Sequence, residues 1–289
     1  MTCFTGIWVP LVTPFHHGEI DFPALQTLAR KMAQAGVAGL VVCGTTGEAA
    51  ALTGQEQLAV LDAVLKAAPD CRVVMGLAGN NLRALLGTLK QLEAMPIAGL
   101  LVPPPYYIRP SQAGIVDYFE TLADAAPAPL IIYNIPYRTG VAIERQTIAA
   151  IARHERVVAI KDCGGSAALT MDLIRDAQLE VLAGEDEQIF STLCLGGAGA
   201  IAASAHIRPD LFVRMAQLVQ AGQLEPARKL FYDLLPMIRL LFAEPNPAPV
   251  KEALALMGLM RNELRSPMKG ASPELSARLK QELIRIERL

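Results

Sequence analysis

The chain has 289 residues, of which 52% are hydrophobic and 19% charged, with a formal net charge of −2. This composition is typical of a globular protein with a large core and excludes a disordered chain. No basic run is longer than a pair, so the positive surface that nucleic-acid binding requires is missing. We expect a small-molecule partner rather than nucleic acid or a membrane.

The longest uncharged stretch, residues 188–207, has the length of a membrane span. It contains Gly196, Gly197 and Gly199, which favour a helix, a turn and a buried strand instead. The N-terminal residues show neither a basic region nor a cleavage-site pattern, and this favours a cytoplasmic location.

The cysteines are odd in number and lack zinc-type spacing, which indicates reduced thiols inside a cell. The four histidines form no cluster with cysteines or carboxylates, so we expect no metal site built by the protein. The cysteines are Cys3, Cys43, Cys71, Cys163 and Cys194.

Short runs rich in Val, Ile and Leu recur along the chain, and segments of helical periodicity separate them. Predicted strands are residues 6–10, 39–43, 72–76, 99–102, 130–134, 157–160, 180–183 and 199–201. Predicted helices are residues 22–34, 55–67, 82–94, 111–125, 145–152, 167–175, 187–195 and 209–220.

Continuously apolar strands belong to parallel sheets that are covered on both faces, and strand-helix units in this number can close into a TIM (β/α)8 barrel. A doubly wound open sheet is the alternative, because periodicity does not report closure. From Leu224 onward only helical patterns continue. We therefore predict an α/β chain with a catalytic barrel domain at residues 1–224 and a C-terminal helical domain at residues 225–289.

Catalytic groups of a barrel lie at the carboxyl ends of its strands. The run VVAIK ends in Lys161, directly after four apolar residues. Burial disfavours a charged amine, and a neutral amine is the form that attacks a carbonyl to give an imine. A solvated lysine that starts a loop is the plainer alternative.

Other predicted strand ends also place polar groups at this edge. In GTTGE, the hydroxyls and amides of Thr45 and Thr46 can hold a carboxylate, although the same residues can cap a helix. In YNIPYRTG, Tyr133 can carry protons, and the planar guanidinium of Arg138 can bind a second carboxylate. PPPYYIRPS presents Tyr106 and Tyr107, a pair suited to a subunit contact.

Taken in order, GIWVPLVTPF, GTTGE, PPPYYIRPSQ, YNIPYRTG, AIKD, GAGAIAASA and EPNPAPVKEAL resemble the dihydrodipicolinate synthase and N-acetylneuraminate lyase superfamily. The resemblance covers essentially the whole chain and is strongest to the dihydrodipicolinate synthase family. It implies a Schiff-base lyase that condenses pyruvate with L-aspartate 4-semialdehyde to 4-hydroxy-tetrahydrodipicolinate in lysine biosynthesis.

The same resemblance assigns roles residue by residue. Lys161 forms the imine with pyruvate, and no metal or organic cofactor is implied. Tyr107 reaches in from the neighbouring subunit, so at least a dimer is expected, and a dimer of dimers by resemblance. The implied catalytic residues are Lys161, Tyr133, Thr45 and Tyr107. The implied substrate-binding residues are Thr46 for the pyruvate carboxylate, Arg138 for the semialdehyde, and the backbone near Gly184 and Ile201.

The chain departs from the family pattern at two places. After Lys161 it has DCGGS, which puts Cys163 near the amine. Lysine-inhibited members carry histidine and glutamate around a regulatory pocket, whereas this chain keeps Asn80 but has other residues around it. We therefore predict weak or absent feedback by lysine. The differing residues are Ala49, Gly54, Gln57 and Ala84.

Two alternatives stay open at this point. The same lysine could serve an aldolase or dehydratase of 2-keto-3-deoxy sugar acids, which Arg138 and the tyrosine pair disfavour. The second alternative is a barrel that binds a keto acid as a sensor or scaffold, without turnover.

Overall fold

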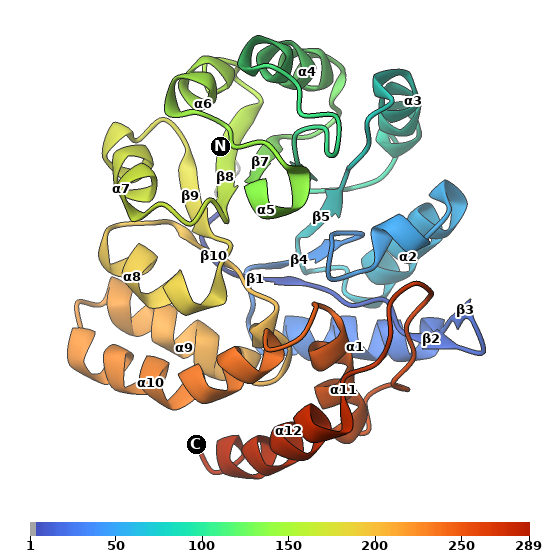
Figure 1. The fold of residues 1–289 in the computed structure, drawn as a ribbon, viewed down its shortest axis with the longest axis vertical. Helices are drawn as coiled ribbons and strands as arrows, with labels where there is room; N and C mark the ends of the chain where they lie inside the picture. Colours follow the sequence, from blue (N-terminus) through green and yellow to red (C-terminus); the bar gives the residue numbers. More distant parts are fainter. Residues whose placement is uncertain (1–3) are drawn as a thin grey trace. The chain divides into compact units, whose positions relative to one another are not determined.

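The computed structural model describes residues 4–289, so Cys3 lies outside the described residues. Eight parallel strands form a closed barrel in the order β1-β10-β9-β8-β7-β6-β5-β4 (Figure 1). The predicted TIM barrel is therefore confirmed, and the open doubly wound sheet is not the fold. The barrel strands are β1 (Gly6–Pro10), β4 (Gly39–Val42), β5 (Val73–Gly76), β6 (Gly99–Val102), β7 (Leu130–Asn134), β8 (Val157–Asp162), β9 (Glu180–Ala183) and β10 (Gly199–Ile201).

The chain divides into two compact units. The first contains residues 72–201 and the described residues 4–5, with strands β5 to β10 paired in parallel in chain order. Asn81, Ser111 and Ser166 cap three of its helices by accepting a backbone N–H with the side chain. Its α-helices are α3 (Leu82–Leu92), α4 (Gln112–Ala125), α5 (Pro136–Thr139), α6 (Arg145–Ile151), α7 (Ala167–Asp176) and α8 (Ile189–Cys194).

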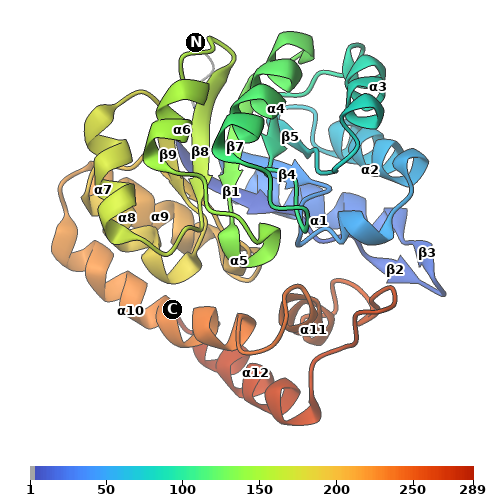
Figure 2. The ribbon, with the colours of Figure 1, turned by 45° about the horizontal axis from the view of Figure 1, so that its top comes forward.

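The second unit contains residues 6–71 and 202–289. In it β1 pairs with β4 in parallel, and β2 (Phe15–His16) with β3 (Glu19–Ile20) forms a short antiparallel hairpin. Helix α10 packs against both α9 and α12, and α11 packs against α12 (Figure 2). Its α-helices are α1 (Phe22–Gln34), α2 (Gly54–Ala67), α9 (Pro209–Gln220), α10 (Leu224–Leu241), α11 (Ala248–Leu256) and α12 (Pro273–Ile286).

The barrel strands are almost wholly buried, as their continuous apolar sequences predict. The stretch 188–207 contains the end of a 3-10 turn, α8 and β10, which confirms its interpretation as buried globular structure. No helix within residues 4–289 has both the length and the apolar character needed to span a bilayer. The division at residue 224 into a barrel and a helical domain stays a prediction.

Candidate active site

Lys161 and Tyr133 lie opposite each other at the carboxyl ends of β8 and β7, as a register pair of the parallel ladder. Lys161 Nζ is 4.3 Å from the centroid of the Tyr133 ring. The two residues are only 6% and 7% exposed. The sequence predicts that β8 ends at residue 160, but the strand continues through Lys161, so backbone pairing fixes this residue. The plainer alternative of a solvated loop lysine is wrong.

Asp162 follows Lys161 in the strand and holds the next rung of the ladder together. Its Oδ1 accepts hydrogen bonds from Asn134 Nδ2 at 3.0 Å and from the Gly164 backbone at 2.9 Å. Its Oδ2 accepts a hydrogen bond from Thr170 Oγ1 at 2.7 Å. The carboxylate therefore ties β7, β8 and the start of α7 together beside the lysine. The sequence pattern does not single out this role, because local periodicity does not show that Asn134, 28 positions away, lies beside Asp162.

Gly184 lies just beyond β9, where its backbone N–H donates to the Asp162 carbonyl at 2.9 Å. A Cβ atom at this position would be 2.2 Å from Cys163 Sγ and 3.0 Å from Lys161 Cγ. Only glycine fits beside the lysine stem while Cys163 is present. Burial raises the pKa of the Cys163 thiol to about 12, so the thiol is neutral at physiological pH.

Arg138 lies on α5, a short helix that the sequence analysis does not predict. Its guanidinium carbon is 5.7 Å from the centroid of the exposed Tyr137 ring. Tyr137 in turn donates a hydrogen bond to Glu185 Oε1 at 3.1 Å. This places a cation, a phenol and a carboxylate just past β7 and β9. Ile201, the last residue of β10, is 1% exposed.

Tyr107 has a left-handed backbone with φ of 71°, and its N–H donates to the Thr139 carbonyl at 3.1 Å. Its side chain is 89% exposed. A tyrosine this exposed does not enter the buried surroundings of Lys161 within the same chain. Tyr106 and Ile108 on either side are also exposed, at 42% and 58%. Three consecutive large side chains are therefore exposed to solvent at this loop.

The GTTGE loop follows β4 in the second unit. Thr46 is 4% exposed, and its Oγ1 accepts a hydrogen bond from Asn246 Nδ2 at 3.0 Å. Thr45 is half-buried. The loop does not cap α2, because Thr53 makes the capping box of that helix with Glu56. The alternative that these threonines cap α2 is therefore wrong.

Glu48, the last residue of this motif, forms a buried ion pair with Lys251 of α11. The pKa of Lys251 is lowered, chiefly by burial. Lys251 Nζ also donates to the Glu263 carbonyl at 2.8 Å, and it lies 4.2 Å from the centroid of the Phe15 ring. A buried pair with these additional partners keeps both charges satisfied. The loop that contains Thr45 and Thr46 is thereby attached to α11.

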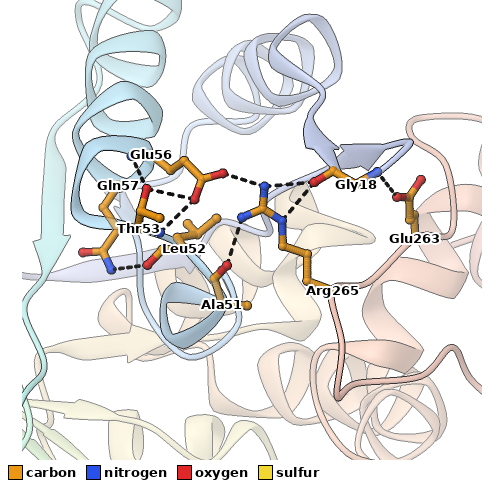
Figure 3. A network of polar contacts seen from close by, with 8 residues as sticks. All are labelled: Gly18, Ala51, Leu52, Thr53, Glu56, Gln57, Glu263 and Arg265. Carbon is orange, nitrogen blue, oxygen red and sulfur yellow. Dashed lines mark hydrogen bonds and ion pairs between the residues drawn. The ribbon is translucent and has the colours of Figure 1, made fainter.

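Arg265 extends this attachment (Figure 3). Its guanidinium donates to the Gly18 carbonyl, to the Ala51 carbonyl at 2.9 Å and to Glu56 Oε1 at 2.5 Å. Hydrogen bonds from Arg265 and from the Thr53 backbone hold the pKa of Glu56 at about 2. Glu263 accepts the Gly18 backbone N–H at 2.5 Å. One C-terminal segment therefore ties the β2–β3 hairpin to the start of α2.

Within residues 4–289, no group of three or more His, Cys, Asp or Glu side chains is arranged to hold a metal ion. Cys163 and Cys43 are buried free thiols, and Cys194 is exposed.

Comparison with known proteins identifies the family. The family model of the dihydrodipicolinate synthetase family matches residues 3–286. The 4-hydroxy-tetrahydrodipicolinate synthase of Haloarcula marismortui is 38% identical over 288 residues, covering 98% of this chain and 94% of that protein. A dihydrodipicolinate synthase structure from Thermotoga maritima is 33% identical, with a TM-score of 0.95 and 99% of each chain covered. A structure described as a monomeric dihydrodipicolinate synthase variant is also 33% identical, with a TM-score of 0.95, covering 100% of this chain and 98% of that chain. The chain belongs to the dihydrodipicolinate synthetase family.

Proposed function

We propose that this chain is a 4-hydroxy-tetrahydrodipicolinate synthase, a lyase of lysine biosynthesis that condenses pyruvate with L-aspartate 4-semialdehyde. The observation that carries the proposal is the buried Lys161 amine against the Tyr133 ring at the strand ends of a barrel. Named relatives at 38% identity over nearly the full length support the choice of reaction.

In this reaction the Lys161 amine attacks the keto carbon of pyruvate, and water leaves to give the iminium. Loss of a methyl proton then converts the iminium to an enamine, because the iminium nitrogen takes up the electron pair that the proton leaves behind. No metal or organic cofactor is therefore proposed. The enamine carbon attacks the aldehyde carbon of the semialdehyde. The amine of that substrate then displaces Lys161 and closes the ring, so one water is lost overall and the lysine is regenerated.

The other residues take the roles that the resemblance implies. Tyr133, Thr45 and the partner-derived hydroxyl of Tyr107 relay protons, and Thr46 binds the pyruvate carboxylate. Arg138 receives the semialdehyde carboxylate, and the backbone at Gly184 and Ile201 lines the pyruvate pocket. The strand-end positions of these groups support this assignment, because barrel enzymes place their chemistry there.

A homo-oligomer of at least two copies follows from the role of Tyr107. Its 89% exposure and the exposed neighbours Tyr106 and Ile108 support a second copy of this chain as the covering partner. We propose a dimer of dimers, which sedimentation equilibrium would measure directly.

Borohydride reduction in the presence of pyruvate tests the reaction at its first step. We expect a single modified peptide containing Lys161. Turnover of pyruvate with aspartate semialdehyde is then compared with cleavage of a panel of 2-keto-3-deoxy sugar acids. If Lys161 is labelled but the semialdehyde is not turned over, the imine with pyruvate would be supported and aspartate semialdehyde as the second substrate would be overturned.

A further inference from the structure

Asn246 contacts the loop that is proposed to bind pyruvate. It lies in the segment EPNPAPVK, just before α11, and its Nδ2 donates to Thr46 Oγ1 at 3.0 Å. A hydroxyl has one hydrogen to donate and two lone pairs that accept. The bond from Asn246 occupies one lone pair of Thr46, and it leaves the hydroxyl hydrogen for a different acceptor.

The backbone around Thr46 is already fixed. A Cβ atom on Gly47 would be 3.0 Å from the Leu11 carbonyl oxygen, so a larger residue there would require the neighbouring backbone to shift. The Gly47 carbonyl accepts the Thr13 hydroxyl at 2.7 Å, and Glu48 is held by its buried ion pair. These contacts restrain the backbone that follows Thr46, and the hydrogen bond from Asn246 restricts the rotation of the Thr46 hydroxyl itself.

Asn246 is itself held by the element that secures the loop. The Lys251 backbone N–H donates to the Pro247 carbonyl at 3.0 Å, and the Lys251 side chain pairs with Glu48. Thr46 and Glu48 are two residues apart, and the same short C-terminal segment provides a partner for each. The amide nitrogen therefore approaches the hydroxyl from a rigid support.

We infer that Asn246 is a positioning residue for pyruvate: its amide nitrogen orients the Thr46 hydroxyl so that the hydrogen points to the substrate carboxylate. This inference rests on the proposed function, since Thr46 is taken as the carboxylate site. A hydroxyl that donates a hydrogen bond to a carboxylate makes a charge-assisted bond, which is stronger than a hydrogen bond between neutral groups.

The experiment is a double-mutant cycle of Asn246→Ala and Thr46→Val, read as KM for pyruvate and kcat separately. Asn246→Ala should raise the KM for pyruvate about tenfold, the scale of one hydrogen bond to a charged group. In the Thr46→Val background the same substitution should change KM less than twofold, because there is no hydroxyl left to orient. Asn246→Asp, which is nearly isosteric but presents only acceptors and a negative charge, should raise KM more than Asn246→Ala.

Asn262→Ala serves as the matched control, because Asn262 lies in the same C-terminal region and hydrogen-bonds Glu252 instead. It should lower the melting temperature without changing the KM for pyruvate. An unchanged KM in Asn246→Ala, or an equal rise with and without the Thr46 hydroxyl, would overturn the inference. If Asn246→Ala does not fold, Asn246→Asp alone decides, and an unchanged KM there has the same meaning. Failure of borohydride to label the wild-type protein would instead overturn the proposed function.

Discussion

Tyr133 and Lys161 share one rung of the β7–β8 ladder, with the lysine amine 4.3 Å from the centre of the tyrosine ring. The contact is made by the ring face, so it does not need the hydroxyl. Tyr133→Phe should therefore keep the ring contact with the amine and remove the hydroxyl that is proposed to carry protons. We expect kcat to fall by about 10²- to 10⁴-fold, the range for loss of a general acid-base group. Steady-state assays with both substrates would measure this.

Borohydride trapping separates this effect from a damaged site. Tyr133→Phe should still be labelled at Lys161, at a lower rate than the wild-type protein. Tyr232→Phe, at a tyrosine on α10 that is 61% exposed, is the control and should be fully active. A Tyr133→Phe enzyme with an unchanged kcat would remove the tyrosine from the proton relay.

Gly184 and Cys163 make a second testable pair. Ala at position 184 would put its Cβ 2.2 Å from Cys163 Sγ, and such overpacking typically costs about 1–3 kcal/mol of unfolding free energy. Adding Cys163→Ala should restore much of the stability, because the sulfur is then absent. Activity should recover less, since the new methyl group still lies 3.0 Å from Lys161 Cγ. Urea unfolding and kcat of both variants check the two parts.

The single Cys163→Ala variant completes this cycle. If the two substitutions proved additive in unfolding free energy, the contact between the sulfur and position 184 would not be the cause of the damage.

The barrel could be predicted from the sequence because its strands are buried on both faces. The apolar runs at residues 99–102 and 130–134 coincide with β6 and β7. A continuous apolar run is typical of a parallel strand that is covered on both faces. The sequence pattern does not predict the β2–β3 hairpin or α5. Each hairpin strand has two residues, and α5 has four, so neither is long enough to show a period.

The site could be predicted only in part. Lys161 stands out because a charged residue ends an apolar run, and local sequence alone shows this. The links of Asp162 to Thr170 and of Asn246 to Thr46 join residues 8 and 200 positions apart. The first pair is brought together by the turn into α7, and the second by the return of the chain after the barrel. Neither link is visible in local periodicity.

Feedback by L-lysine is predicted to be weak or absent. Gln57 is at a position that the resemblance assigns to the regulatory pocket of lysine-inhibited members, and its amide donates to the Ala49 carbonyl at 3.0 Å. Ala84, at another, has only a methyl group and cannot pair with an ammonium. Asn80 Oδ1 accepts the Tyr106 backbone N–H at 3.0 Å. Initial rates across physiological lysine concentrations should stay nearly constant, and strong inhibition would refute this prediction.

His206 makes the stability of the fold depend on pH. It is 0% exposed, and its two ring nitrogens lie between the Val12 N–H at 3.2 Å and the Ala203 carbonyl at 2.7 Å. The N–H of Val12 can only donate and the carbonyl can only accept, so Nε2 is bare and Nδ1 carries the hydrogen. Protonation would direct a second hydrogen at the Val12 N–H. Burial lowers the pKa of His206 to about 4, and the hydrogen bond to the Ala203 carbonyl, which raises this pKa, offsets only part of the effect.

The sign of the effect follows from that lowered pKa. The unfolded chain binds a proton at His206 below about pH 6.5, whereas the folded protein does so only below about pH 4. The contribution of this histidine is therefore nearly complete above about pH 6.5 and is lost progressively as the pH falls from there to about 4, by about 3 kcal/mol in total. Between pH 7 and pH 5 the loss should be about 2 kcal/mol. His206→Gln keeps an acceptor for Val12 but cannot titrate, so its unfolding free energy should fall less over this range. Urea denaturation of both proteins at pH 7 and pH 5 measures the difference. An equal loss of unfolding free energy in the two proteins would show that another group controls the acid sensitivity.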